Sequence, residues 1–108
     1  MNTHISYMYR DASNYKQYNE AIVEGELSLE DQNTILGCLD EGEYFIPRQV
    51  GLPEKRFEKI TEDDHCWFEM GSAFASPCSL EPTVNLTSAQ LVANFVAAKD
   101  SWNDCVLF

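Results

Sequence analysis

The sequence predicts a single α+β domain over residues 1–108, with two helices packed on one face of an antiparallel or mixed sheet. Its 108 residues have the length of one domain, and a hydrophobic content of 44% is that of a globular protein. Alternating residues indicate strands, and two capping signals indicate the starts of helices. The expected order of elements is β-β-α-β-β-α.

The first two elements are predicted to form a β-hairpin. Residues 5–9 alternate, with Tyr7 and Tyr9 on one face. Residues 11–14 have turn chemistry, because Asp and Asn side chains bond to nearby backbone. Residues 17–26 alternate again and are expected to return as the second strand. We expect the two tyrosines in the core; the alternative is an exposed aromatic face that meets a protein partner.

The first helix is predicted to begin after Ser28. This side chain can accept from the amide three residues on, and Asp31 lies near the positive end of the helix dipole. The pattern is a near-match to a capping box, with Asp in the place of Glu. We expect Gly42 to end the helix, because glycine adopts the left-handed conformation that often follows a helix without steric strain. The apolar stripe of this helix consists of Ile35, Leu36 and Leu39.

The middle of the chain is predicted to add two more strands. Residues 43–50 look extended, and Pro47 confines them to a sheet edge or a strand end. Residues 65–70 have the pattern of a strand, whereas residues 54–60 fit either one helical turn or a strand. Residues 71–82 contain Gly, Ser, Ala and two prolines, and we expect them to form the longest irregular segment.

The second helix has the clearest signal in the chain. Thr87 and Gln90 form a capping box, and Leu86 before it can pack against Leu91 after it. Residues 103–108 are expected to follow as a short, flexible tail. The predicted apolar face of this helix carries Leu91, Val92, Phe95, Val96 and Trp102.

Acidic residues dominate the composition and narrow the class of partner. The chain has eighteen Asp and Glu residues but only seven Lys and Arg, which gives a net charge of −11. Residues 20–64 contain thirteen of the acids. Such a surface repels phosphate and anionic lipids and attracts basic protein surfaces. The sequence therefore predicts a non-enzymatic protein-binding module whose partner is a basic surface, such as that of a nucleic-acid-binding enzyme, rather than nucleic acid or membrane itself. We expect its carboxylates to lie unneutralised on one side of the molecule, and the predicted partner-binding residues are Asp40, Glu41, Glu43, Glu62, Asp63 and Asp64.

Four basic residues form the main interruption in this acidic stretch. Arg48, Lys55, Arg56 and Lys59 lie within twelve residues, close to aromatic side chains. Bases interleaved with aromatics can bind single-stranded nucleic acid. Because acidic residues alternate with these bases, we expect them to form salt bridges in a surface of mixed charge.

The compartment predicted from the sequence is the cytoplasm. No apolar run approaches the ~18 residues that span a bilayer, and the first residues lack the charged and apolar segments of a secretory signal. The four cysteines are spaced without any C-x-x-C pair, and a disulfide framework would call for secretion. We expect free, mostly buried thiols at Cys38, Cys66, Cys78 and Cys105.

Residues 63–66 form the densest group of reactive side chains. A thiol nucleophile needs a base within hydrogen-bond reach, but adjacent residues on a strand point to opposite faces, so His65 is poorly placed to activate Cys66. No His or Cys spacing matches a zinc site, and no phosphate-binding or hydrolase motif is present. We therefore expect no catalytic residue, metal or cofactor. A small metal- or thiol-dependent enzyme that uses His65 is the alternative.

Two segments carry a resemblance to known sequences. They are YRDASNYK at residues 9–16, and FIPRQVGLP at residues 45–53, which runs on to DHCWF at residues 64–68. Together they resemble a family of short acidic proteins, without an assigned activity, found among gut bacteria and on their mobile elements. The likeness covers residues 5–70. A mobile-element setting implies a second alternative, a DNA-mimic inhibitor whose carboxylates replace phosphates in a host restriction or CRISPR nuclease.

Overall fold

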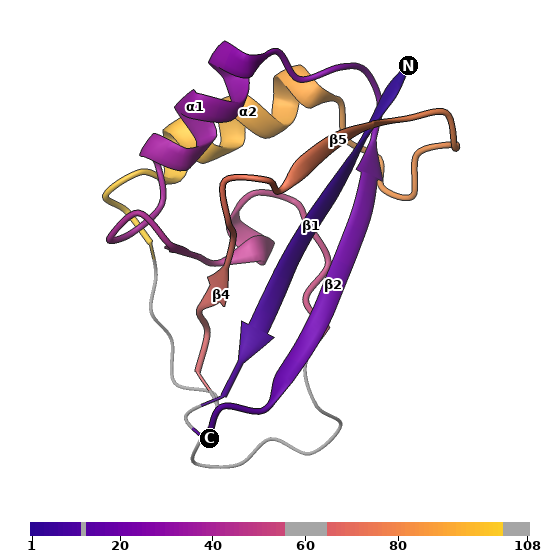
Figure 1. Cartoon of the computed structure of the whole chain (residues 1–108). Helices are drawn as coiled ribbons and strands as arrows, with labels where there is room; N and C mark the ends of the chain where they lie inside the picture. The colour runs from indigo at the N-terminus through magenta and orange to yellow at the C-terminus, as the bar shows by residue number, and fades with distance from the viewer. Residues whose placement is uncertain (12, 56–64, 103–108) are drawn as a thin grey trace.

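The computed structural model describes residues 1–11, 13–55 and 65–102. They form one five-stranded antiparallel sheet with two helices packed on one of its faces (Figure 1). The predicted α+β class and element pattern are confirmed, and the structure adds a fifth strand. Neither described helix could cross a bilayer. The elements are β1 (Asn2–Arg10), β2 (Lys16–Val23), α1 (Leu29–Gly37), β3 (Tyr44–Phe45), a 3-10 helix η1 (Pro47–Gln49), β4 (Phe68–Glu69), β5 (Ala75–Cys78) and α2 (Ser88–Ala98).

Strand β1 is the centre of the sheet. It pairs with β2 along one side, from Thr3 opposite Val23 to Arg10 opposite Lys16. On its other side it pairs first with β5 and then with β4, and β3 lies beyond β4. Because successive side chains of a strand point to opposite faces, β1 divides cleanly between the core and the open face of the sheet. Thr3, Ile5, Tyr7 and Tyr9 are the residues of β1 that are buried.

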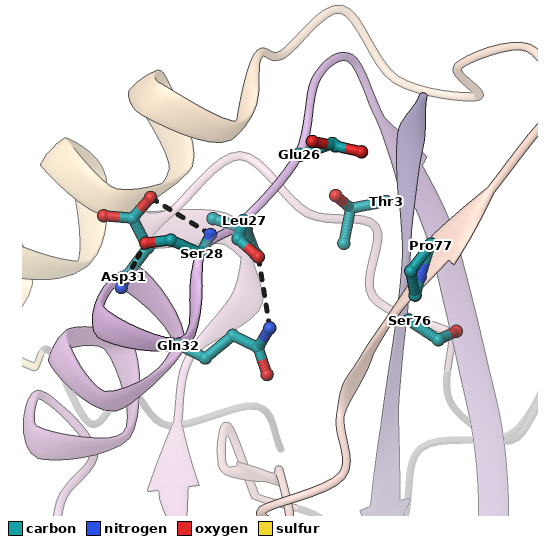
Figure 2. Close-up of a pocket in the computed structure, with 8 residues that line it drawn as sticks. All are labelled: Thr3, Glu26, Leu27, Ser28, Asp31, Gln32, Ser76 and Pro77. Carbon is teal, nitrogen blue, oxygen red and sulfur yellow. Dashed lines mark hydrogen bonds between the residues drawn. The ribbon is translucent and has the colours of Figure 1, made fainter.

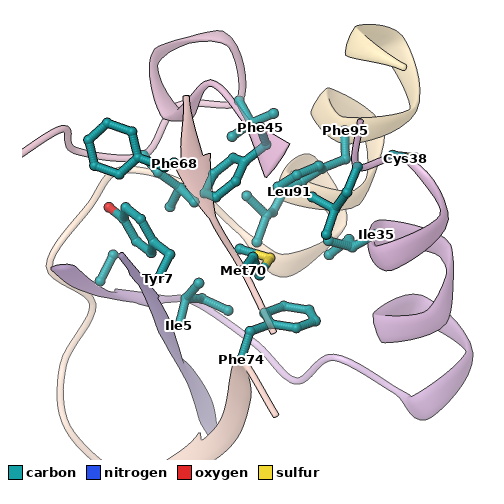
Figure 3. Close-up of a cluster of buried hydrophobic side chains, with 14 of the residues drawn as sticks. Ile5, Tyr7, Ile35, Cys38, Phe45, Phe68, Met70, Phe74, Leu91 and Phe95 are labelled. Atoms are coloured by element: carbon teal, nitrogen blue, oxygen red, sulfur yellow. The ribbon is translucent and has the colours of Figure 1, made fainter. Parts of the chain in front are cut away.

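The core lies between the sheet and the two helices, and Figure 3 shows its closely packed side chains. Phe45 lies at its centre, with its ring 5.5 Å from that of Phe95 on α2 and 5.6 Å from that of Tyr7 on β1. Helix α1 contributes Ile35, which is fully buried. The expectation that Tyr7 is a core residue is therefore confirmed, and the same holds for Tyr9.

Both helices begin where the capping signals predicted. Ser28 accepts from the Asp31 amide at 3.0 Å, and the Asp31 carboxylate accepts from the Ser28 amide. Thr87 and Gln90 make the equivalent pair of bonds at the start of α2. The prediction that Gly42 ends the first helix was wrong. The helix ends at Gly37, because the next amides fold back onto carbonyls three residues earlier and tighten the chain into a turn.

Three strand predictions need correction. The strand predicted over residues 65–70 is limited to β4, Phe68–Glu69. The extended segment expected over residues 43–50 is limited to β3, because Pro47 starts the 3-10 helix η1, where its missing N–H costs nothing. Residues 71–82, expected to be irregular, contain β5. Small residues and Pro77 concealed this strand, which lies at a sheet edge and needs only β1 as a neighbour. The predictions for residues 56–60 and for the tail 103–108 fall outside the described residues.

The expectation of free thiols was wrong at Cys66, and Cys105 lies outside the described residues. Cys38 and Cys78 are free, but Cys66 is disulfide-bonded. Sequence spacing reveals a disulfide only where it follows a known local pattern, and partners that meet through the fold leave no such signal. Trp102 also lies beyond the end of α2 rather than on its face, and its indole N–H donates to the carbonyl oxygen of Cys38 at 3.1 Å.

Candidate functional site

The turn between α1 and β3 presents three neighbouring carboxylates, and we call residues 40–43 the acidic turn. The backbone of Asp40 both donates to and accepts from that of Tyr44, with N···O distances of 2.7 and 2.9 Å. Glu41 and Gly42 adopt left-handed conformations, with φ of 54° and 74°. This tight reversal leaves the side chains of Asp40, Glu41 and Glu43 exposed to solvent.

The carboxylates of the acidic turn are not neutralised by cations of the described residues. Within residues 1–11, 13–55 and 65–102, ion pairs join Arg10 to Glu69 at 3.0 Å and Arg48 to Glu54 at 3.3 Å, and the ring of His4 hydrogen-bonds to Glu20 at 3.0 Å. None of them involves the turn. The expected salt bridging of the basic segment is confirmed at Arg48, while Arg56 and Lys59 lie outside the described residues.

The charge of the acidic turn shifts the pKa of Tyr44. The carboxylate of Glu43 raises the pKa of the Tyr44 hydroxyl, with smaller contributions from burial, from Glu69 and from Glu41. All three charges act in the same direction, since each disfavours the phenolate. Because Glu69 is paired with Arg10, the unneutralised charge beside Tyr44 comes from the acidic turn.

A hollow of about 760 Å³ adjoins the acidic turn, and we call it the acidic hollow. Its lining includes three carboxylate residues that come from different parts of the chain: Glu43 of the turn, Glu69 of β4 and Glu20 of β2. Between these charges lie apolar side chains. The sheet brings Glu69 here by placing it opposite both Met8 of β1 and Tyr44 of β3. The apolar residues of the lining include Met8, Leu36, Met70 and Phe74.

A second hollow, of about 470 Å³, lies between the start of α1 and strands β1 and β5 (Figure 2). Its polar groups already have partners: Ser28 and Asp31 cap the helix, Gln32 donates to the carbonyl of Leu27, and Thr3 donates to that of Gly25. The carboxylate of Asp31 would also repel an anion from the helix N-terminus. This hollow is explained by the packing and capping of α1.

The structure brings only some of the predicted partner-binding residues together. Asp40, Glu41 and Glu43 form the acidic turn, whereas Glu62, Asp63 and Asp64 lie outside the described residues. The expectation that the carboxylates share one side stays a prediction. A second exposed group, Glu24, Glu26 and Glu30, lies near the opposite end of α1. Sequence reasoning missed Glu20 and Glu69, which reach the acidic hollow only through strand pairing.

His65 is held by hydrogen bonds at both ring nitrogens. Its Nε2 donates to the carbonyl of Arg10 at 2.7 Å, and its Nδ1 accepts from the amide of Trp67 at 3.1 Å. It lines neither the acidic hollow nor the hollow at the start of α1. Within the described part of the chain, no group of three or more His, Cys, Asp or Glu residues is arranged to hold a metal ion.

Comparison of this chain with protein-family models, with curated proteins and with solved structures finds no match. The functional argument therefore depends on the geometry and charge of the acidic turn and its hollow.

Proposed function

We propose that this protein is a binding module for a basic segment of a partner protein, held at the acidic turn and the acidic hollow. The observation that carries this proposal is the junction of an unneutralised three-carboxylate turn with a hollow of about 760 Å³ that is partly apolar. A charged surface without a concavity would attract many cations with little selectivity. The hollow adds a defined shape, which makes binding to the charged turn more selective.

Lysine and arginine side chains suit such a site. Their methylene stems pack against apolar surface while the charged head stays near carboxylates and water. In the acidic hollow, Met8 would contact the stem, and Glu43 would meet the head. Charge of this kind chiefly raises the association rate and selects among partners, and the apolar contacts set how long the complex lasts.

The test compares two variants that remove the same amount of charge. One combines Asp40→Asn, Glu41→Gln and Glu43→Gln in the acidic turn. The matched control combines Glu24→Gln, Glu26→Gln and Glu30→Gln, which are also exposed. The probe is a fluorescein-labelled peptide of alternating lysine and leucine, whose dissociation constant is measured by fluorescence anisotropy.

We expect the turn variant to bind the peptide about tenfold more weakly, and the control to stay within about threefold of the unmodified protein. Added salt should weaken binding to the unmodified protein, because the carboxylates of the turn are exposed and are screened. Equal losses in the two variants would show that net charge alone attracts the peptide, and the proposed site would then be rejected.

The two alternative functions stay predictions. No distance or contact among the described residues favours a DNA mimic over a protein-binding module, and none favours an enzyme that uses His65. The cytoplasmic localisation also stays a prediction. The disulfide of Cys66 weighs against it, because such bonds rarely persist in a reducing compartment.

A further inference from the structure

Strand β2 forms a long free edge of the sheet. Among the described strands it pairs only with β1, so every second residue directs its backbone N–H and C=O away from the sheet. The amide of Asp11 bonds to the carbonyl of Tyr15 beside the hairpin turn, and alternation from this bond gives the outward positions as Lys16, Tyr18, Glu20 and Ile22.

At the far end of this edge, Ile22 confirms which residues of β2 point outward, and its backbone groups already have a partner. The amide of Ile22 donates to the Thr83 hydroxyl at 2.8 Å, and the Ile22 carbonyl accepts from the Thr83 amide at 2.9 Å. In the part of the chain that the structure describes, no equivalent partner covers the outward backbone groups of Lys16, Tyr18 or Glu20. Among the described residues, three successive outward positions are therefore left for another strand.

Two of the usual protections of an edge strand, a proline and a β-bulge, are missing here. Strand β2 contains no proline, and its pairing with β1 runs through all eight residues without a bulge. The side chain of Tyr18 is 70% exposed. A hollow of about 440 Å³, lined by residues 18–20 and 53–55, lies alongside this edge and gives a second strand room to approach.

We propose that this edge pairs with β2 of a second copy of the same chain, antiparallel and related by a two-fold axis at Tyr18. In this register Lys16 lies opposite Glu20 of the other copy, and Tyr18 lies opposite itself. Each of the three open positions then exchanges two backbone hydrogen bonds with its counterpart. An aromatic pair is flanked by two pairs of opposite charge, which is a favourable cross-strand arrangement.

Local charge favours a second copy over the basic segment proposed for the acidic hollow. The edge carries Lys16 and Glu20 in balance, so a basic strand would gain as much repulsion as attraction. A second copy presents the complementary sequence by symmetry. The net charge of −11 on each copy opposes association, so we expect a weak dimer that forms at the concentration of an NMR sample. This inference does not depend on the proposed function.

Two charge reversals test the register. Lys16→Glu places like charges opposite one another in the dimer, and so does Glu20→Lys. The first makes the net charge −13 and the second makes it −9, each a change of two from −11. Net charge alone would therefore move self-association in opposite directions. The proposed register predicts that both variants associate roughly tenfold more weakly, as measured by sedimentation equilibrium.

Combining the two charge reversals should restore self-association. An equimolar mixture of the two single variants should associate again, because an edge with two acids then faces an edge with two bases. The double variant Lys16→Glu/Glu20→Lys keeps the charge of −11 and should also recover self-association. Far-UV circular dichroism checks that each variant is folded. A protein that stays monomeric at NMR concentration, single variants that leave association unchanged or move it in opposite directions, or a mixture that fails to associate would each overturn the proposal.

Discussion

Two tyrosines show how single residues respond to the surrounding charge. Tyr44 lies at the surface beside Glu43, which raises its pKa directly. Tyr7 is buried, and burial followed by the charge of Glu54 raises its pKa strongly. Its hydroxyl donates to the carbonyl of Pro53 at 2.6 Å and so ties β1 to the segment that follows η1. This contact makes a pH-dependent contribution to stability.

Tyr7→Phe should lower the free energy of unfolding by about 1 kcal/mol near neutral pH, because one buried hydrogen bond is lost. Below the ordinary tyrosine pKa of about 10, the hydroxyl is protonated in both the folded and unfolded states, and its contribution is complete. Above that pH, the unfolded chain releases the proton while the folded protein retains it, so the contribution declines as pH rises toward the folded pKa.

The measurement is urea unfolding of both proteins near neutral pH and at about pH 11. The difference between them should shrink at the higher pH. Tyr15→Phe, at an exposed tyrosine, is the control and should change little near neutral pH. A difference that stays constant with pH would contradict this account of Tyr7.

At the scale of elements, Gly25 joins β2 to both β1 and α2. Its amide donates to the side chain of Asn2 and its carbonyl accepts from Thr3, at 3.2 and 2.7 Å. Its φ is +91°, and a Cβ added there would lie 2.9 Å from the Ser88 hydroxyl. Only glycine fits this connection without strain.

Gly25→Ala should therefore lower the free energy of unfolding by about 1–2 kcal/mol or more. Gly37→Ala is the matched variant. This glycine lies in the last turn of α1, where a Cβ would meet nothing within 4 Å, so the change should stabilise by about 0.5–1 kcal/mol. Both values come from urea unfolding at 25 °C. If alanine were tolerated equally at both positions, the left-handed connection at Gly25 would not be required.

The elements also show where prediction from the sequence succeeds. Both helix starts were predictable because a capping box is complete within four residues, as at Ser28 and Thr87. The end of α1 and the strand β5 were not. Gly42 is left-handed as expected, but it serves the turn after the helix, and β5 exists because residues 2–5 provide it with a distant partner.

For the whole molecule, the net charge of −11 is divided into local groups. The acidic turn and the group at residues 24–30 lie near opposite ends of α1, a helix of nine residues that spans about 13 Å. This separation exceeds the Debye length of about 8 Å at physiological salt, so the two groups act almost independently. Only the acidic turn adjoins the acidic hollow.

Only the part of the candidate site that is contiguous in the sequence could be predicted. Asp40, Glu41 and Glu43 are neighbours in the sequence, so their clustering needed no knowledge of the fold. Glu20 and Glu69 join them only because β1 pairs with β2 on one side and with β4 on the other. The hollow itself is a product of that pairing, and composition gives no sign of it.

The most direct test of the proposed function is to map where the lysine–leucine peptide binds, using amide chemical shifts of the ¹⁵N-labelled protein. We expect the largest shifts at Gly42, Glu43, Glu69 and Met70, with little change near Glu26 and Ser28. Shifts spread evenly over both acidic groups, or centred on the start of α1, would contradict a binding site at the acidic turn and hollow.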